Sequence, residues 1–173
     1  MASREDLYDE AVRTHGAALD RLARAYEADP DRRRDLLQEI HLGLWRSFES
    51  FGGRCSLRTW LYRVAHNIAT SHVVSDRRTR SRQLLSLDEM DVADPKSDIE
   101  KSAERNLEVD HLMSLIQELK PVDRQLVLLF LEGVDAPGIG EVTGMSPGNV
   151  ATRIHRIKNI LRSRFQEGRN HDE

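Results

Sequence analysis

Apolar residues recur along this chain three and four positions apart, and no segment alternates apolar and polar residues as a strand does. This spacing indicates helices almost throughout. Pro30 and the pair Gly52-Gly53 divide the first half, while Pro121 opens and Gly133 closes a helix in the second. The pattern predicts an all-α protein with helices, placed to within about two to four residues, at 4–28, 31–50, 56–78, 107–119, 121–132, 137–143 and 147–166.

The stretch 86–104 breaks the helical pattern and divides the chain. It is acidic, contains Pro95 and carries few large apolar residues, a composition typical of a flexible linker. A short surface helix with solvated charges is the alternative. A coil of this length would span about 25 Å. We therefore expect two small helical domains, at 1–85 and 107–168, joined by a flexible acidic linker over 86–106.

The segment 139–150 has the residue order of a helix-turn-helix. A short helix would end at Gly144, since glycine adopts the left-handed conformation that a tight turn needs. Ser146 would cap the following helix, and Pro147 suits its first position. Gly140 stands four residues before the turn, where two crossing helices must approach closely. These features predict a DNA-reading motif, with an ordinary helical hairpin as the alternative.

The helix after this turn has one apolar and one polar side. Its apolar stripe, expected in the core, is Val150, Ile154, Ile157 and Leu161. Its polar side, which is able to donate hydrogen bonds, comprises Gly148, Asn149, Thr152, His155, Arg156 and Asn159. Because the polar side begins at the helix N-terminus, the end that usually enters the major groove, we expect it to read duplex DNA.

The helix at 31–50 carries a second face beside its main apolar stripe. This face mixes apolar and polar side chains at helical spacing: Asp35, Gln38, Leu42, Trp45 and Glu49. An exposed tryptophan among polar residues often marks a partner-binding surface. The alternative, equally compatible with the periodicity, is that Leu42 and Trp45 pack on a third helix of the same domain.

The helix at 56–78 combines aromatic residues with arginines on the side opposite its apolar stripe. That side comprises Thr59, Tyr62, Arg63, His66, Thr70 and Arg77, with Trp60 and Asn67 on the flank. Such a mixture suits single-stranded or melted DNA, because bases stack on rings while cations meet phosphates. A solvated basic face with Trp60 in the core is the alternative.

Charge is distributed unevenly, although the whole chain carries a net charge of only −3. Residues 54–84 carry seven arginines against one acid, and residues 146–169 carry six basic residues against one acid. Between them, residues 85–110 carry nine acids against three basic residues. Two basic patches therefore coincide with the two helices that we expect to meet nucleic acid.

Several classes of function are not indicated. The single Cys55 cannot form an internal disulfide and the scattered histidines offer no metal site, so we expect neither a metal nor another cofactor. We expect Cys55 to be an inert residue at a helix start rather than a redox-sensitive thiol. No catalytic or phosphate-binding motif occurs, which argues against an enzyme. The charged N-terminus and the short longest apolar run, Leu126–Leu131, predict a cytoplasmic protein without membrane insertion.

Together these segments resemble the extracytoplasmic-function (ECF) sigma factors of the sigma-70 family over nearly the whole chain. Residues 35–39 (Asp-Leu-Leu-Gln-Glu), followed by 44–46 (Leu-Trp-Arg), are similar to the segment that grips the clamp coiled coil of the largest subunit of core RNA polymerase. Residues 54–67 are similar to the promoter-melting segment, and 67–80 to the part that reads the minus-10 element. Residues 119–161 resemble the fourth domain, which reads the minus-35 element.

The resemblance implies three sets of site residues. Core polymerase would bind Asp35, Gln38, Glu39, Leu42 and Trp45. The minus-10 element would be melted and read by Trp60, Tyr62, Arg63, His66, Asn67, Thr70, Ser71, Arg77 and Arg78. The minus-35 element would be read by Ser146, Pro147, Gly148, Asn149, Thr152, Arg153 and Arg156.

The implied function is that of a dissociable, non-enzymatic subunit that directs core polymerase to promoters and assists DNA opening. Its implied partners are core polymerase, promoter DNA and an anti-sigma factor that holds it inactive. The alternative function is a stand-alone helix-turn-helix regulator that binds duplex DNA without polymerase. Such a regulator would need a ligand-binding or dimerisation domain within residues 1–85, and the melting-like segment would stay unexplained.

Overall fold

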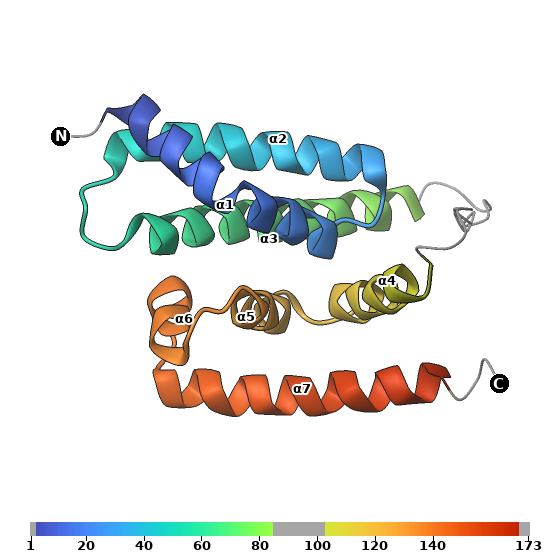
Figure 1. Cartoon of the computed structure of the whole chain (residues 1–173). Helices are drawn as coiled ribbons and strands as arrows, with labels where there is room; N and C mark the ends of the chain where they lie inside the picture. The colour runs from blue at the N-terminus through green and yellow to red at the C-terminus, as the bar shows by residue number, and fades with distance from the viewer. Residues whose placement is uncertain (1–2, 85–102, 170–173) are drawn as a thin grey trace.

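The structure, a computed structural model, describes residues 3–84 and 103–169, and within these ranges the chain is helical and contains no strand. Figure 1 shows the order of the helices along the chain. A 3-10 turn, η1 (Phe48–Ser50), follows the second helix. The α-helices are α1 (Arg4–Tyr26), α2 (Pro30–Ser47), α3 (Leu57–Leu84), α4 (Ala103–Gln117), α5 (Pro121–Leu131), α6 (Ala136–Thr143) and α7 (Pro147–Arg169). The all-α prediction is confirmed.

The first three helices form one unit, here called the N-terminal unit. Ser3 caps α1 by accepting a hydrogen bond from the backbone N–H of Asp6, and Asp29 caps α2 by accepting from the N–H groups of Asp31 and Arg32. All three helices contribute to its core, with fully buried side chains at Leu19, Leu36, Ile40, Leu44 and Leu61. The inward apolar stripes predicted from the periodicity therefore hold this unit together.

The last four helices form a second unit, here called the C-terminal unit. Its fully buried side chains come from every helix: Ile116, Leu126, Leu129, Ile139, Val150 and Ile157. Gly133 takes a positive φ of 72° after α5, so the chain turns there as the sequence predicted. Asp135 then caps α6 by accepting from the backbone N–H of Gly138 at 2.9 Å.

The helix boundaries agree with the predictions to within a few residues, with two informative differences. The helix α3 continues to Leu84, beyond the predicted end at 78. The helix α4 begins at Ala103, so residues 103–106, assigned to the linker, are helical. The rest of that predicted linker, 86–102, lies outside the described residues.

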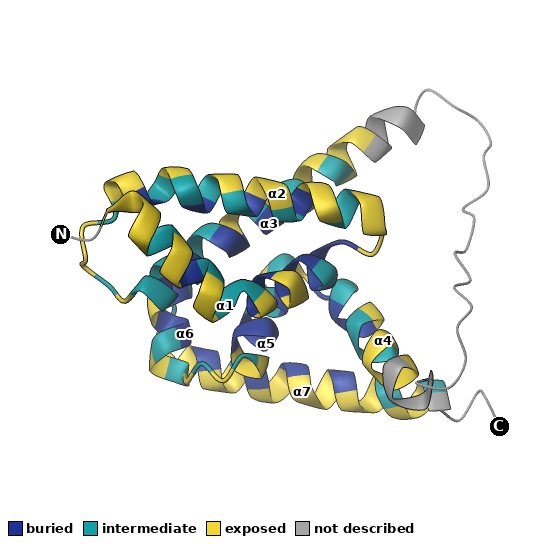
Figure 2. Cartoon of the chain, turned by 45° about the horizontal axis from the view of Figure 1, so that its top comes forward, coloured by how far each residue is buried: buried dark blue, intermediate teal, exposed yellow. Residues whose placement is uncertain are grey.

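The two units pack against each other. The helix α3 contacts α6, and α1 contacts both α4 and α5. In Figure 1, α4, α5 and α6 lie between the N-terminal unit and α7, which forms the outer layer. Figure 2 shows that buried positions on α2 and α7 face inward while their outward sides are exposed. Among the described residues, the outer faces of these two helices are therefore exposed to solvent.

Candidate nucleic-acid interface

The turn between α6 and α7 has the predicted helix-turn-helix geometry. Gly144 ends α6 with a left-handed φ of 79°, and its N–H donates to the carbonyl of Gly140 at 2.8 Å. The Ser146 hydroxyl accepts from the N–H of Asn149 at 3.3 Å and so caps α7. A Cβ at Gly140 would lie 2.6 Å from the carbonyl oxygen of Met145, closer than real Cβ atoms come. The glycine is therefore required by the close approach of the turn.

The two sides of α7 are as predicted. The four stripe residues Val150, Ile154, Ile157 and Leu161 are buried. The predicted reading residues Ser146, Pro147, Gly148, Asn149, Thr152 and Arg156 are all exposed, as are His155 and Asn159. Arg153 differs, because it is half-buried and donates to the Asp123 carboxylate of α5 at 2.8 and 3.1 Å. This ion pair links α7 to α5 within the C-terminal unit.

The second face of α2 lies open to solvent. Asp35, Gln38 and Glu39 are exposed, and Leu42 is 48% exposed despite its apolar side chain. Trp45 is half-buried between α1 residues, with Tyr8 edge-on at 5.4 Å and the Arg4 guanidinium 4.5 Å from its ring centre. Trp45 therefore packs on another helix of the same unit, as the alternative interpretation held, whereas Leu42 does not. The result is an apolar centre with a charged rim, the usual anatomy of a protein interface.

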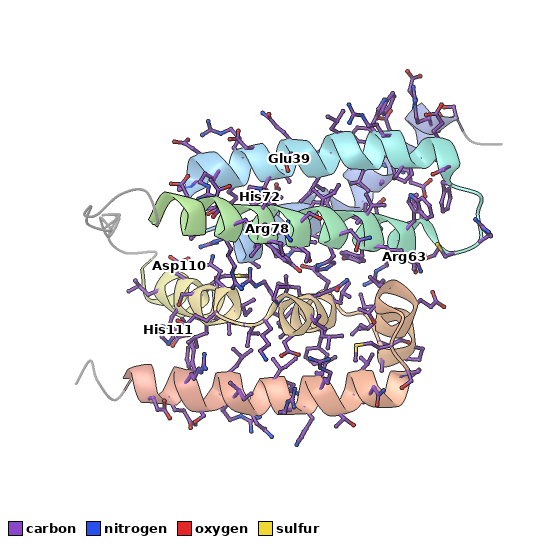
Figure 3. All side chains as sticks on the ribbon, turned by 180° about the vertical axis from the view of Figure 1, so that it is seen from behind. Glu39, Arg63, His72, Arg78, Asp110 and His111 are labelled. Atoms are coloured by element: carbon purple, nitrogen blue, oxygen red, sulfur yellow. The ribbon has the colours of Figure 1, made fainter. Side chains whose placement is uncertain are left out.

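The C-terminal half of α3 presents the exposed part of the predicted minus-10 set. Asn67, Ser71, Arg77 and Arg78 are exposed, and Thr70 is half-buried. Figure 3 shows Arg78 on this helix, near the end distant from α6. Donor groups and two cations therefore remain accessible here, as contacts to bases and phosphates require.

The N-terminal half of α3 differs from the sequence prediction. Tyr62 and His66 were placed on the polar side opposite the core, yet only 2% and 1% of their surfaces are exposed. The Tyr26 hydroxyl of α1 lies 3.1 Å from His66 Nδ1, and Tyr62 lies against the His66 ring. Arg63 is half-buried and donates to the backbone carbonyl of Glu141 at 2.5 Å. Packing on α1 and the C-terminal unit accounts for these positions.

Trp60 stands on the flank of α3, as expected, and its indole is fixed by neighbours. Its Nε1 donates to the Ser47 hydroxyl at 3.0 Å, and its ring packs on Phe51 at 5.5 Å. A pocket of about 570 Å³ opens beside it, lined also by Arg63 and Cys55. Trp60 is therefore half-buried rather than freely available for stacking.

A polar cluster between α2 and α3 was not predicted from the sequence. Glu27, at the end of α1, is 8% exposed, and its carboxylate lies 3.2 Å from His72 Nε2 and 3.4 Å from the Arg32 guanidinium. Arg32 also pairs with Asp76 of α3. Figure 3 shows Glu39 and His72 meeting across the two helices. Apart from Glu27, these groups line a pocket of about 490 Å³ shared with Asn67, Ser71, Ser75 and Thr79. Residues this far apart in sequence give no local signal for such a cluster.

Burial sets the protonation of the aromatic cluster under α3. It lowers the pKa of His66 to about 3 and raises the pKa of Tyr26 to about 12. His66 is therefore neutral at physiological pH, with the protonated Tyr26 hydroxyl as its hydrogen-bond partner. A neutral, buried imidazole is a structural group here, and it cannot serve as a cation for DNA phosphates.

A pH dependence of stability follows from His66. In the unfolded chain this histidine titrates near pH 6.5, so between about pH 6.5 and 3 the unfolded state binds more protons. We expect the free energy of unfolding to fall with decreasing pH by up to about 1.4 kcal/mol per pH unit from this group. Urea denaturation of wild type and His66→Gln between these pH values measures it. The free energy of unfolding should change less steeply with pH in His66→Gln than in wild type. Equal pH dependence in the two proteins would refute the role assigned to His66.

Comparison with known proteins agrees with this geometry. The family model "Sigma-70 region 2" matches residues 11–79, and "Sigma-70, region 4" matches residues 110–161. The ECF RNA polymerase sigma-E factor of Haemophilus influenzae is 29% identical over 142 residues, covering 76% of this chain and 74% of that protein. The ECF sigma factor SigX of Bacillus subtilis is 26% identical over 141 residues, covering 80% and 73%. The chain belongs to the ECF group of the sigma-70 family.

Solved structures support the fold of this sigma factor. CnrH in complex with the cytosolic domain of CnrY superimposes with a TM-score of 0.64 at 20% identity, covering 92% of this chain and 88% of that chain. RpoE of Bartonella quintana in complex with the anti-sigma factor NepR gives 0.63 at 19% identity, covering 90% and 94%. In residues 3–84 and 103–169, no helix is long and apolar enough to cross a membrane.

Proposed function

We propose that this sigma factor carries out its function through three separate surfaces. The exposed face of α2 binds core RNA polymerase, the exposed part of α3 meets the opened minus-10 region, and the polar side of α7 reads the minus-35 element. The observation that carries the proposal is Leu42, an apolar side chain 48% exposed among charged neighbours. A stand-alone regulator has no need of such a partner-binding face.

The polymerase contact is proposed for Asp35, Gln38, Glu39, Leu42 and Trp45. Support comes from the exposure of the first four along one side of α2 and from the similarity to the clamp-binding segment of the family. The Trp45 ring contacts Tyr8 and Arg4 of α1, and these contacts hold the indole in a fixed orientation. A preorganised aromatic beside an exposed leucine is a typical anchor of a protein interface.

The minus-35 contact is proposed for the first turns of α7. Exposed donors at Asn149, Thr152 and Arg156 follow the helix N-terminus, the end that recognition helices insert into the major groove. Arg153 is proposed to act indirectly, because its guanidinium already pairs with Asp123. It would orient α7 while its neighbours contact DNA.

The Arg156 contribution has a direct test. If Arg156 pairs with a base, Arg156→Ala should cost about 1–3 kcal/mol and relax the preference at one promoter position. If Arg156 contacts a phosphate, the Arg156→Ala variant should bind all promoter sequences more weakly by the same factor. The slope of log affinity against log salt concentration should then become shallower by about one unit. Titration of holoenzyme against promoter variants at several salt concentrations distinguishes the two. Unchanged affinity and unchanged salt dependence would remove Arg156 from the interface.

The minus-10 contact is proposed for the exposed residues of α3. Asn67, Ser71, Arg77 and Arg78 are accessible, and the pocket of about 490 Å³ beside Asn67 and Ser71 adds a polar recess next to them. Arginines here would hold the phosphates of the opened strand. Arg63 would join this surface only as far as the C-terminal unit moves away, because it donates to the Glu141 carbonyl. Tyr62 and His66 pack against His15 and Tyr26 of α1, so their part would be to support the surface from beneath.

The role is proposed to be recognition and not catalysis. The sigma factor would act in the cytoplasm, where core polymerase makes the RNA, and it would need no metal or other cofactor. A protein inhibitor is also proposed, since the structural relatives CnrH and RpoE were solved with CnrY and with the anti-sigma factor NepR. The exposed α2 face is the surface such an inhibitor would occlude. Isolation of the native protein free of any bound regulator in all growth states would count against it.

A further inference from the structure

The second half of α3 extends beyond the apolar core of the N-terminal unit. Among the described side chains of this helix, Ala69 is the last that is buried, and none of residues 70–79 is. Val73, partly buried, is the last apolar residue of the helix that packs against the core. Figure 2 shows exposed and intermediate positions along this end of the helix. Apolar packing therefore ends before Arg77 and Arg78, two of the residues proposed to meet the opened DNA.

Polar contacts hold this half of the helix where the apolar packing ends. His72 and Asp76 lie one turn apart on the same side of α3, and both are half-buried. His72 Nε2 lies 3.2 Å from the carboxylate of Glu27, and Asp76 pairs with the guanidinium of Arg32 on α2. Figure 3 shows His72 on the side of α3 that faces α2. The reading half of α3 is therefore tied to the start of α2 through charged and hydrogen-bonding groups.

Glu27 joins these two contacts into one cluster. It directly follows α1 and is only 8% exposed. Its Oε2 lies 3.2 Å from His72 Nε2 and 3.4 Å from Arg32 Nε. Its Oε1 accepts a hydrogen bond at 3.1 Å from the backbone N–H of Asp29, the residue that caps α2. A carboxylate held at both oxygens has little freedom to move, so the cluster links the end of α1, the first turn of α2 and the second half of α3.

Asp76 stands in an otherwise basic segment. Residues 54–84 carry seven arginines and this single acid, and a carboxylate beside DNA repels phosphates unless its charge is balanced. Arg32 balances it, and the side chains of the pair are only 32% and 26% exposed. Solvent and salt screen a partly buried pair less than a surface pair. The favourable contribution of this acid is therefore its contact with α2, and not a contact with DNA.

Reading a base and holding a phosphate require different precision. A hydrogen bond to a base edge needs a donor–acceptor distance of about 2.7–3.2 Å and a nearly straight angle. The attraction between an arginine and phosphates acts over about 10 Å and tolerates small shifts. A small displacement of the second half of α3 should therefore weaken the discrimination between bases before it weakens the attraction to DNA.

We propose that Arg32 and His72 are positioning residues for the reading of the minus-10 element. This rests on the proposed function of α3. Through Asp76 and Glu27 they fix the second half of α3 on α2, and they contact no DNA themselves. Because α2 also carries the proposed polymerase face, the cluster fixes the direction in which the reading surface points from the polymerase.

The test measures how well the holoenzyme distinguishes promoters. The DNAs are a promoter that the wild-type holoenzyme uses, a copy with an altered minus-10 element and a copy with an altered minus-35 element. Arg32→Ala and His72→Ala should each lower the affinity ratio for the minus-10 pair by roughly five- to tenfold, about the value of one base contact. The ratio for the minus-35 pair should not change. A variant that merely folds less well has a smaller active fraction on every DNA, which leaves both ratios unchanged.

Two further variants separate positioning from charge and from side-chain loss. Arg34→Ala removes the same charge from the same helix, but Arg34 pairs with Asp31 within α2. It should therefore discriminate as wild type does. His72→Gln keeps a side-chain N–H that can reach Glu27, and it should recover most of the discrimination that His72→Ala loses. All four variants should bind core polymerase as tightly as wild type.

Hydrogen exchange in the free protein reports the position of the helix directly. The amides of residues 70–79 should exchange faster in Arg32→Ala and His72→Ala than in wild type or Arg34→Ala. Unchanged minus-10 discrimination in either alanine variant would overturn the proposal. Lost discrimination with unchanged exchange would overturn it too, because the residues would then contact DNA themselves. A wild-type holoenzyme that does not distinguish the minus-10 pair contradicts the proposed function of α3, whereas variants that distinguish it as well as a discriminating wild type contradict only the positioning role.

Discussion

Leu42→Asp abolishes promoter-directed transcription and leaves the protein folded: this is the expected result if the α2 face binds core polymerase. Truncation of a central interface anchor typically costs about 2 kcal/mol or more, roughly thirtyfold in affinity. Aspartate costs more, because it also leaves a charge in a site that loses water on binding. Folding should survive, since the side chain is 48% exposed and contributes little to the core.

Circular dichroism beside a core-polymerase pulldown measures both parts of this expectation. Val109→Asp is the matched control, because Val109 lies on α4 with 45% exposure and outside the proposed polymerase face. That control should retain polymerase binding. A folded Leu42→Asp that still binds polymerase as wild type does would contradict the assignment. DNA binding through the exposed side of α7 should be unaffected in both variants.

Gly140→Ala is expected to destabilise the C-terminal unit by about 1–3 kcal/mol, because overpacking against rigid backbone forces the turn to shift. The added Cβ would lie 2.6 Å from the Met145 carbonyl oxygen, which belongs to the turn itself. A loss of this size lowers the melting temperature of a small domain by roughly 4–8 °C for each kcal/mol.

Gly148→Ala is the control for this prediction, since a Cβ there would meet nothing within 4 Å. In a helix that change alone stabilises by up to about 1 kcal/mol. Thermal melting of the two variants should therefore shift in opposite directions. A Gly140→Ala protein as stable as wild type would show that the turn is less tightly determined than the structure indicates.

The local features of this protein were predictable from the sequence because each is determined by neighbouring residues. A turn glycine, a capping serine and a proline at the first helical position act within a few residues of one another, so the helix-turn-helix could be read at Gly144, Ser146 and Pro147. The outward face of α7 followed from the positions of Val150 and Ile157 on the opposite side.

The contacts between distant helices were not predictable in the same way. Periodicity identifies the polar side of a helix but not the element that covers it, so Tyr62 and His66 were expected on an open face and are buried. The Arg21–Glu132 pair joins residues 111 positions apart, and nothing in either local sequence indicates the other. Arg153 was assigned to DNA from the family resemblance, which could not indicate that Asp123 of another helix pairs with it.

The central claim is that this sigma factor gives core RNA polymerase its promoter choice. Its most direct test is transcription of genomic DNA by purified core polymerase with and without the protein, followed by sequencing of the RNA 5′ ends. We expect new start sites that depend on the protein, share two upstream sequence elements and disappear with Leu42→Asp. Start sites that are unchanged by the protein would contradict it.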